Sequence, residues 1–451
     1  MTTHSEATGA KRLRTLLGGR TEMTTTSSTA RFTADLVKVA VGGTVGVVQD
    51  TLIARVRRRN GANDPVTRFS PFSPEVIADP YPEYDLLLAG PPVRYNPRLG
   101  IWIIPGFADV RAGLLDHERL SSTEGWSRFR AKLPISITSD HARWRRLVSP
   151  ALTPRALGVW QSLIEQLTDD FFERMIGMPS PDGVRDLAQQ LPIRLITSMF
   201  GIPEADHPKF LAWSKALIDG SFVDVGRQTF GVGERMVRAT FALRRYVLPL
   251  IEQRRRHPGN DLISMMTLSE DDDTLTNEEI FWALLTLVMA GGDTTIHLLS
   301  GLLHTFAVQP DLYDTLRDQP ALIPAAIEEQ LRFESPVQGF YRTATVDYPI
   351  EHHVIPRQSR VLLLFGAANR DPRHFDQPNT FRLDRDPVDH LSFGCGIHYC
   401  LGAHLTRMEA HQVVSHLTKR VAAVELTGPP QRKQNATMRG LERLPLRLVP
   451  V

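Results

Sequence analysis

Apolar residues dominate one long stretch of the chain, from about residue 277 to residue 307. Thr276 precedes the stretch and Glu279 follows three positions later, which is the pairing of a capping box that satisfies free amide groups at a helix start. Pro310 ends the pattern. About thirty residues at ~1.5 Å each span ~45 Å, which is long for a globular helix. The pattern therefore predicts one long helix, either in the protein core or across a membrane.

The polar residues within this stretch favour the core. Asp293 lies near its centre, between a glycine pair and a threonine pair. An ionisable side chain is costly in lipid and is usually functional wherever it lies. We therefore expect a buried central helix in a soluble protein, and we keep a membrane-spanning receptor as the alternative.

The remaining pattern predicts a mainly α-helical domain with small β-sheets, which we place at residues 66–451. Amphipathic helical periodicity fills most of residues 155–265, and a last long helix is expected at residues 401–421. Short runs typical of strands occur at residues 92–95, 100–104, 343–347, 360–365 and 441–448.

Residues 1–65 are expected to form a separate N-terminal extension. The first sixty residues hold ten lysines and arginines against four acidic residues. An apolar stretch at residues 36–48 is too short to span a bilayer as a helix, and a basic cluster follows at residues 55–59. Such a pairing can lie on an anionic membrane surface. A helix packed on the body of the protein explains it as well, and both interpretations stay open.

Composition narrows the class of protein. The chain has 451 residues, of which 42% are hydrophobic and 23% charged, as is typical of a globular protein with a large core. The formal net charge of +2 gives no reason to expect a nucleic-acid partner. Two cysteines exclude a disulfide framework and the four thiolates of an iron–sulfur cluster, and they fit a reducing compartment such as the cytoplasm.

One of the two cysteines stands in a glycine-rich segment. Residues 390–402 read HLSFGCGIHYCLG, where two glycines allow a tight backbone bend before Cys400. Cys400 precedes a predicted helix, whose N-terminal dipole favours a thiolate. A thiolate there suits a metal ligand or a nucleophile, and the plain alternative is a small buried hydrophobic residue. The ordered motif Phe-Gly-x-Gly-x-His-x-Cys-x-Gly favours a chemical role.

This motif resembles the haem-binding loop of the cytochrome P450 superfamily. The resemblance implies that Cys400 is the axial thiolate ligand of the iron of haem b, with Phe393 shielding the sulfur and Gly402 against the cofactor. Cys395 fills a variable position and is expected to be structural. The resemblance also implies the P450 fold: a prism-like helical body with a β-rich side region, and haem between the long central helix and the helix after the cysteine.

The long helix carries a second motif, AGGDTT, at residues 290–295. Two glycines within a helix cost roughly 1 kcal/mol each relative to alanine, and a flat cofactor lying against Ala290 and this pair would explain them. The resemblance assigns Asp293 and Thr294 to the acid–alcohol pair that relays protons to dioxygen on the iron. The structural alternative is that Thr294 bonds to a local carbonyl and Asp293 forms a salt bridge.

Two further clusters fit the resemblance. Glu329 and Arg332 lie on one helix face, and with Arg385 they resemble the structural Glu–Arg–Arg lock of the family. Buried haem propionates need cationic partners, and the residues that the resemblance assigns to them are His141, Arg145, Arg342 and His398.

Residues 141–146 read HARWRR, for which a solvated basic helix face is the plain alternative. The resemblance gives Arg143 and Arg146 no role at the propionates, and we expect both on the surface nearest the haem thiolate. There they would dock an acidic electron donor, because complementary charge speeds the encounter.

The resemblance places four residues on the substrate side of the haem: Thr286, Met289, Gln338 and Met438. The methionines, with Ala290, would form an adaptable apolar wall, and Thr286 and Gln338 would orient a substrate oxygen. For Thr286, a hydroxyl bonded back to its own helix is the alternative. A loop at residues 121–140, rich in cations, would roof the pocket.

As a whole, the resemblance implies a bacterial, cytoplasmic monooxygenase that inserts one oxygen atom from O2 into a hydrophobic small molecule. Candidate substrates are a lipid, a terpenoid or steroid, and a polyketide. Electrons would come from a separate ferredoxin and its reductase, and peripheral membrane contact through the extension stays open. The alternative from another class is a haem-binding carrier or sensor without turnover, for which a proton relay would have no use.

Overall fold

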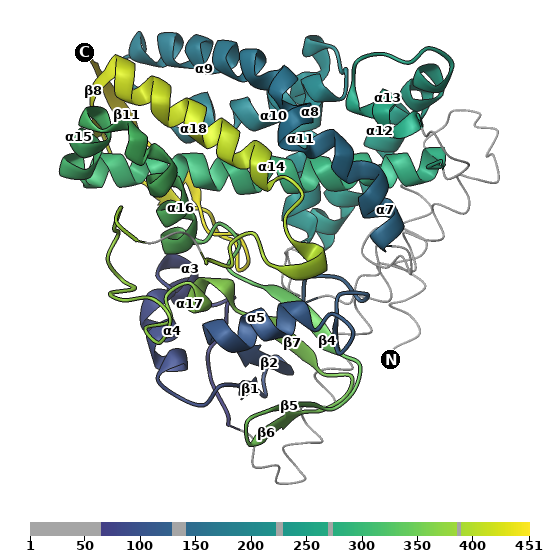
Figure 1. Ribbon diagram of the computed structural model, residues 1–451, viewed down its shortest axis with the longest axis vertical. Helices are drawn as coiled ribbons and strands as arrows, with labels where there is room; N and C mark the ends of the chain where they lie inside the picture. The colour runs from purple at the N-terminus through teal and green to yellow at the C-terminus, as the bar shows by residue number, and fades with distance from the viewer. Residues whose placement is uncertain (1–64, 129–140, 222–228, 269–273, 386–388) are drawn as a thin grey trace. The chain divides into compact units, whose positions relative to one another are not determined.

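The computed structural model describes residues 65–128, 141–221, 229–268, 274–385 and 389–451 (Figure 1). The chain divides into two compact units, Met1–Val41 and Gly42–Val451, and every described residue belongs to the second. The predicted extension lies outside the described residues except for Pro65, whose carbonyl accepts a hydrogen bond from the Tyr95 amide at 2.9 Å. Most of the loop expected to roof the pocket lies outside them as well. The described part is mainly helical with small sheets, as predicted.

Helix α14, Asn277–Val308, runs through the helical part of this unit (Figure 1). The expected capping box is present, because the Glu279 amide donates to Thr276 Oγ1 at 3.2 Å and the Thr276 amide donates to Glu279 Oε2 at 2.7 Å. Among the described helices, α14 alone is long and apolar enough to cross a membrane. However, 72% of its most apolar stretch of 18 residues is buried within the protein. The helix therefore lies in the core, as predicted.

The helices around α14 bury its apolar surface. Helices α10 (Gln190–Met199), α11 (His207–Ser221), α12 (Thr229–Arg256), α16 (Ile323–Glu334) and α18 (Ala403–Arg420) all contact it, and α9 (Gln161–Ile176) covers α18. The other described α-helices are α3 (Pro74–Ala78), α4 (Tyr81–Leu88), α5 (Phe107–Leu115), α7 (His141–Val148), α8 (Pro154–Leu157), α13 (Leu262–Thr267), α15 (Pro310–Asp318) and α17 (Phe365–Ala368).

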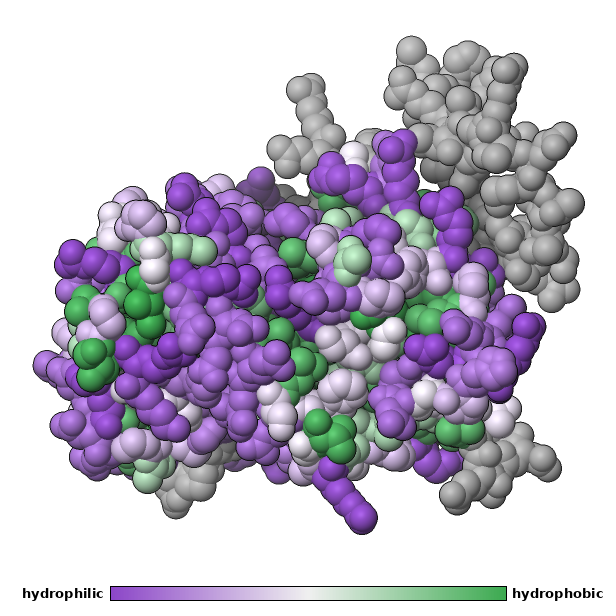
Figure 2. All heavy atoms as spheres, turned by 90° about the horizontal axis from the view of Figure 1, so that it is seen from above, coloured by the Kyte–Doolittle hydropathy of each residue, from purple (hydrophilic) through white to green (hydrophobic). Residues whose placement is uncertain are grey.

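Short helical turns of other types connect these helices. They are η1 (Ser149–Leu152), η2 (Gly158–Trp160), η3 (Val184–Ala188), η4 (Glu204–Asp206), η5 (Pro320–Leu322) and η6 (Gly396–His398). Figure 2 shows that the face seen from above Figure 1 is largely hydrophilic, with apolar side chains in scattered groups. The apolar character of α14 thus belongs to the interior.

A five-stranded sheet forms most of the β region, in the order β1-β2-β7-β4-β3. Strand β2, Ile101–Ile104, pairs in parallel with β7, Arg360–Leu363, and the other neighbours are antiparallel. Helix α5 packs on one face of the sheet and α4 on the other, so all four residues of β2 are buried. Burial on both faces explains the uninterrupted apolar run of β2. The edge strands are β1 (Arg94–Asn96) and β3 (Leu120–Ser121), and β4 (Phe340–Ala344) lies between β7 and β3.

Three two-stranded antiparallel sheets complete the described strands. They are β5 (Tyr348–Ile350) with β6 (His353–Ile355), β8 (Val421–Leu426) with β11 (Leu446–Pro450), and β9 (Gln431–Arg432) with β10 (Leu441–Arg443). The run predicted at residues 343–347 belongs to the end of β4 and the turn that follows it. The tail predicted as a single strand is two strands, because Leu444 and Pro445 separate β10 from β11.

Candidate functional site

The loop before α18 bends sharply around Cys400. Gly394 and Gly396 adopt φ angles of 65° and 69°, in the left-handed region that favours glycine. The Cys400 amide donates to the Phe393 carbonyl at 2.9 Å and closes the loop. The backbone amides of Gly402 and Ala403 then lower the pKa of the Cys400 thiol. The sulfur therefore lies at the N-terminus of α18, where a negative charge is favoured.

The surroundings of this sulfur are more suited to a metal ligand than to a free thiolate. Burial raises the pKa of the Cys400 thiol, although the two amides, Arg145 and Arg407 oppose the rise. A metal ion beside the sulfur reverses this balance, because a coordinating thiol is deprotonated. Among the described residues, no group of three or more His, Cys, Asp or Glu side chains could hold a metal ion. A metal at Cys400 would thus bring its other ligands with a cofactor.

Four cationic or imidazole side chains gather near the loop. The rings of His141 and His398 have centroids 4.4 Å apart. Arg145, on the same helix as His141, donates to the Tyr399 carbonyl next to Cys400. Arg342, from β4, is 4% exposed and donates to a neighbouring backbone carbonyl at 2.9 Å. Helix α7, strand β4 and the cysteine loop thus bring together residues that are far apart in the sequence.

Among the residues that the structure describes, no acidic side chain pairs with this cluster. Burial lowers the pKa of Arg342 to about 10, and burial together with Arg342, His141 and Arg145 lowers the pKa of His398 to about 3. Within the described part of the chain, no Asp or Glu side chain contributes to either shift. A buried cation without a partner is costly. The cluster therefore fits a ligand with buried carboxylates.

Helix α14 leaves open space on the side of Ala290. Ala290 is exposed in the middle of a buried helix, and a Cβ added to Gly291 would meet nothing within 4 Å. One turn further on, Thr295 Oγ1 lies 3.3 Å from Thr406 Oγ1 of α18. The open space thus adjoins the point where α14 meets the helix that follows Cys400. We call this open space beside Ala290 the hollow. Haem b is a flat group with an iron atom and two carboxylates. Its iron suits the sulfur, its flat ring suits the hollow, and its carboxylates suit the cationic cluster.

The comparisons with known proteins agree with this site. The family description "Cytochrome P450" matches residues 135–441. The chain belongs to the cytochrome P450 family. It is 38% identical to beta-dihydromenaquinone-9 omega-hydroxylase of Mycobacterium tuberculosis, over 85% of this chain and 79% of that protein.

Solved structures show the same fold. The crystal structure of CalO2 has a TM-score of 0.77 at 30% identity and covers 85% of this chain and 99% of that one. P450BioI in complex with acyl carrier protein ligated to hexadec-9Z-enoic acid has a TM-score of 0.75 at 32% identity and covers 83% and 100%. This cytochrome P450 is therefore a haem b monooxygenase with the fold predicted from its sequence.

In this cytochrome P450 the acid and the alcohol of AGGDTT point to different partners. Thr294 Oγ1 donates to the Ala290 carbonyl at 2.8 Å. Lys433 Nζ lies 2.8 Å from each carboxylate oxygen of Asp293, and His297 Nε2 lies 3.2 Å from one of them. Burial raises the pKa of Asp293, but His297 and Lys433 outweigh it and hold the pKa well below its ordinary value. The local bond and the salt bridge considered as alternatives are thus both present, and the relay role stays a prediction.

Only one of the two glycines in this motif opens onto the hollow. A Cβ on Gly292 would lie 2.8 Å from Ser214 Oγ and 3.1 Å from Ile193 Cδ1. Gly292 therefore allows α14 to approach α10 and α11 closely. The prediction that a flat cofactor explains both glycines is wrong for Gly292, because helix packing already requires a small residue there.

The predicted lock is assembled behind the site. Arg332 bonds both oxygens of Glu329 at 2.7 and 2.8 Å, and Arg385 Nε bonds Glu329 Oε1 at 2.9 Å. Arg332 also donates to the Asn369 carbonyl at 2.8 Å. These groups are buried or nearly so. Because they contact backbone rather than the hollow, they hold α16 to the loops around residues 369–380.

The predicted substrate residues fall into two groups. Met289 is half-buried and Met438 is buried, and both belong to the apolar cluster around α5 and the sheet. Thr286 is half-buried, and its hydroxyl has no hydrogen-bond partner among the described residues. Gln338 differs, because its Oε1 accepts from Tyr84 at 2.6 Å and its Nε2 donates to two backbone carbonyls at 2.6 and 2.9 Å. Gln338 thus has no free polar atom for a substrate in this structure.

One of the two arginines expected on the docking surface is engaged elsewhere. Arg143 pairs with Glu279 at 2.7 Å and so ties α7 to the start of α14. Arg146 is exposed, as expected. The docking role of both arginines stays a prediction, and the sequence motif did not indicate that Arg143 would meet Glu279 in the fold.

Sequence reasoning missed two sets of residues at the site. His297 stands four residues after Asp293, so helical spacing could have indicated it. Lys433 lies 140 residues away and had no local signal. The cluster of Glu328, His390 and Arg407 beside the cysteine loop was also missed, although Glu328 adjoins the lock residue Glu329.

Proposed function

We propose that this cytochrome P450 hydroxylates the apolar chain of a long-chain lipid. The supporting observations are the apolar cluster that contains Met438 and packs against Met289, next to the exposed Ala290, and 38% identity to an omega-hydroxylase of a dihydromenaquinone. A structural relative at 32% identity is bound to a fatty-acyl carrier protein. The long apolar tail is common to both ligands. The free hydroxyl of Thr286 would orient the polar part of the substrate.

The residues of the site divide the work between two sides of the cofactor. When bound, haem held by a cysteine thiolate supplies activation of dioxygen. Cys400 would hold the iron, Phe393 would cover the sulfur, and His141, Arg145, Arg342 and His398 would bind the propionates. This assignment follows from the anion-free cationic cluster and the two amides on the sulfur.

On the α14 side, Asp293 and Thr294 would hold and pass protons. The hydroxyl of Thr294 lies one turn above the exposed Ala290, at the edge of the hollow. Asp293 is the preceding residue on the same helix, and His297 and Lys433 hold its pKa below the ordinary value in spite of burial. A carboxylate and a hydroxyl in this order can accept a proton from the protein side and donate it into the hollow.

Electrons would come from a separate ferredoxin and its reductase, in the cytoplasm. Ile397 and Tyr399 of the cysteine loop and Arg146 of α7 have exposed side chains. An acidic donor would be attracted by Arg146 and would cover the two apolar side chains.

The deciding experiment for the site is the carbon monoxide difference spectrum of the reduced protein. We expect the red-shifted Soret band of thiolate-ligated haem, and we expect Cys400→Ala to abolish it. Cys395→Ala is the matched control, because it removes the other cysteine of the loop and should keep the band. Survival of the band in Cys400→Ala would overturn the assignment.

The substrate class is tested by titration with three probes. A menaquinone with a long isoprenoid tail and hexadec-9-enoic acid should shift the spin state of the haem, whereas menadione, which has the ring without the tail, should not. With ferredoxin, reductase and O2 the tailed probes should yield hydroxylated products. Binding without product under these conditions would favour a haem carrier instead.

A further inference from the structure

Two adjacent glutamates of α16 serve different partners. Glu329 bonds the lock residues Arg332 and Arg385. Glu328 instead bonds Arg407 of α18, at 2.5 Å to Nε and 2.9 Å to Nη2, and its other contact is His390 Nε2 at 3.1 Å. Burial raises the pKa of Glu328, but Arg407 and His390 outweigh it and lower the pKa to about 2. Glu328 is therefore ionised and holds the guanidinium of Arg407 in one orientation.

The position in which Arg407 is held faces the cysteine loop. Its Cζ lies 4.5 Å from the centre of the Phe393 ring, and one of its terminal nitrogens donates to the Tyr399 hydroxyl at 3.3 Å. Phe393 accepts the backbone hydrogen bond of Cys400, and Tyr399 precedes Cys400. The positive charge thus lies against the loop that carries the sulfur, and it is one of the groups that lower the pKa of the Cys400 thiol.

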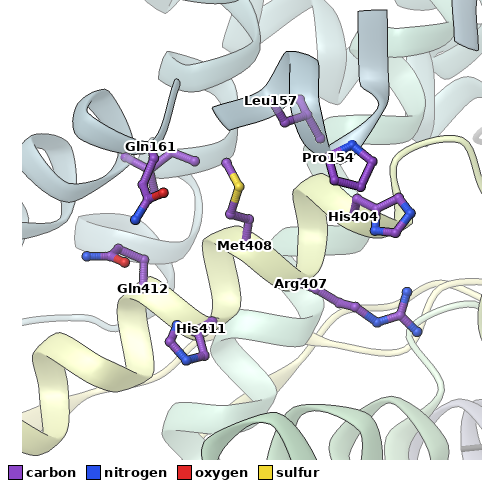
Figure 3. A pocket seen from close by; sticks show the side chains of 9 residues that line it. Pro154, Leu157, Gln161, His404, Arg407, Met408, His411 and Gln412 are labelled. Atoms are coloured by element: carbon purple, nitrogen blue, oxygen red, sulfur yellow. The ribbon is translucent and has the colours of Figure 1, made fainter. Parts of the chain in front are cut away.

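A surface pocket of about 340 Å³ borders the same residue (Figure 3). It lies between α18 and the segment from α8 to α9, and Figure 3 shows Met408 pointing toward Leu157 and Gln161 while Arg407 extends along another side of α18. Arg407 keeps 30% of its side chain exposed. Solvent therefore screens the positive charge of Arg407 only in part. The electric field of this charge acts on the side of the site where the Cys400 sulfur lies.

We infer that Arg407, oriented by Glu328, is a positioning residue that sets the reduction potential of the haem iron. The inference rests on the proposed role of Cys400 as the iron ligand. A fixed positive charge beside the ligand stabilises the state with one more electron, so it raises the potential. The carboxylate of Glu328 opposes part of that field while it fixes the arginine.

The two members of the pair should shift the potential in opposite directions. In Arg407→Met the cation is lost, and the ratio of reduced to oxidised haem at a fixed potential should fall about tenfold, a shift of ~59 mV for one electron. In Glu328→Gln the opposing charge is lost, and the ratio should rise by a smaller factor. Arg407→Lys keeps the charge and should stay within about threefold of the wild type.

A purely structural role predicts a different result. Arg420 lies on the same helix and pairs with Asp169 and Glu173 at 3.2 and 3.3 Å, so Arg420→Met removes a comparable ion pair far from the loop. We expect no change of potential in this control. Shifts of the same sign in Arg407→Met and Glu328→Gln, or an unchanged potential in both, would overturn the inference.

The experiment is a spectroelectrochemical titration of the holoenzyme, with the carbon monoxide difference spectrum recorded for each variant. If the wild type lacks the thiolate band, the assignment of Cys400 fails and this inference fails with it. If the band is present and the potential does not respond, the inference alone fails. If Arg407→Met does not fold, the other two variants still test the inference. It then requires that the reduction potential rises in Glu328→Gln and stays near the wild-type value in Arg407→Lys.

Discussion

Two carboxylates flank the haem site of this cytochrome P450, one buried and one half-buried, and each is held by one imidazole and one basic side chain. On the cysteine side, Glu328 is bonded by His390 and Arg407. On the opposite side, Asp293 is bonded by His297 and Lys433. In both places the partners hold the pKa of the carboxyl below its ordinary value in spite of burial. The two ion pairs, Glu328–Arg407 and Asp293–Lys433, differ in how strictly their geometry is fixed.

The difference lies in the cation. The planar fork of Arg407 bonds Glu328 through two nitrogens, which fixes a single geometry. Lys433 is a point charge on a flexible chain, 2.8 Å from both oxygens of Asp293 and 4.0 Å from Asp219 of α11. His297 adds a further asymmetry, because its buried Nδ1 has no hydrogen-bond partner within the described part of the chain. A rigid pair suits a constant electric field, and an adjustable pair suits a group that must take up and release protons.

The largest expected effect comes from removing the charge of the adjustable carboxylate. Asp293→Asn should lower kcat about 100-fold while the carbon monoxide band is kept, because a positioned proton donor contributes that much to the rate. Product formation with excess ferredoxin and reductase measures it. Glu328→Gln is the comparison, and a similar loss of kcat there would show that the two carboxylates do not differ in role.

Next in size is the loss of stability when the lysine is removed. Lys433→Met leaves Asp293 buried with His297 alone, and we expect it to lower the free energy of unfolding at pH 7 by about 2 kcal/mol. Lys215→Met is the comparison. It breaks the exposed Lys215–Glu442 pair, which joins α11 to the C-terminal strand β10 at 3.3 Å, and it should lower the free energy of unfolding by less than about 1 kcal/mol. Urea unfolding followed by circular dichroism compares them. Equal losses would mean that Lys433 only ties α11 to the C-terminal strands.

A smaller effect is expected from the hydroxyl at the edge of the hollow. Thr294→Ala should keep haem and oxygen consumption but raise peroxide formed per product about tenfold, because one hydrogen bond to the reacting oxygen is lost. Thr295→Ala is the control, since that hydroxyl contacts Thr406 instead. Unchanged coupling in Thr294→Ala would count against the proton relay.

The smallest effect is a dependence on pH. The lowered pKa of Glu328 contributes stability that is present above the unfolded value of about 4 and is lost as the pH falls toward the folded value of about 2. The stability difference between wild type and Glu328→Gln should therefore shrink by about 1 kcal/mol between pH 5 and pH 3. A constant difference across this range would show that the pair is not ionised as described.

The features that could be predicted from the sequence have local signals. The capping box of α14, the glycine turns before Cys400 and the Glu329–Arg332 spacing each involve residues within a few positions of one another. Resemblance to a family supplied the contacts between distant segments, such as Arg342 with His398. Both sources failed where a side chain finds a partner particular to this chain, as in Arg143 with Glu279 and Gln338 with Tyr84.

The same limit explains why Lys433 was missed. Its acidic partners among the described residues are Asp293 of α14 and Asp219 of α11. No spacing rule connects a lysine after β9 to a helix 140 residues earlier. Such pairs are decided by how the C-terminal strands pack on the helices, and packing is a property of the whole fold.

The parallel pairing of β2 with β7 also governs how the chain can fold during synthesis. Ile101 aligns with Arg360, so the centre of the sheet joins an early segment of the chain to a late one. At ~5–20 residues per second, the early strand waits on the order of tens of seconds for its neighbour to leave the ribosome. During that time β2 has only β1 beside it, and the edge that will pair with β7 stays open. Conditions that slow translation, or that remove chaperones, should therefore lower the yield of this enzyme more than that of a protein whose strands pair locally.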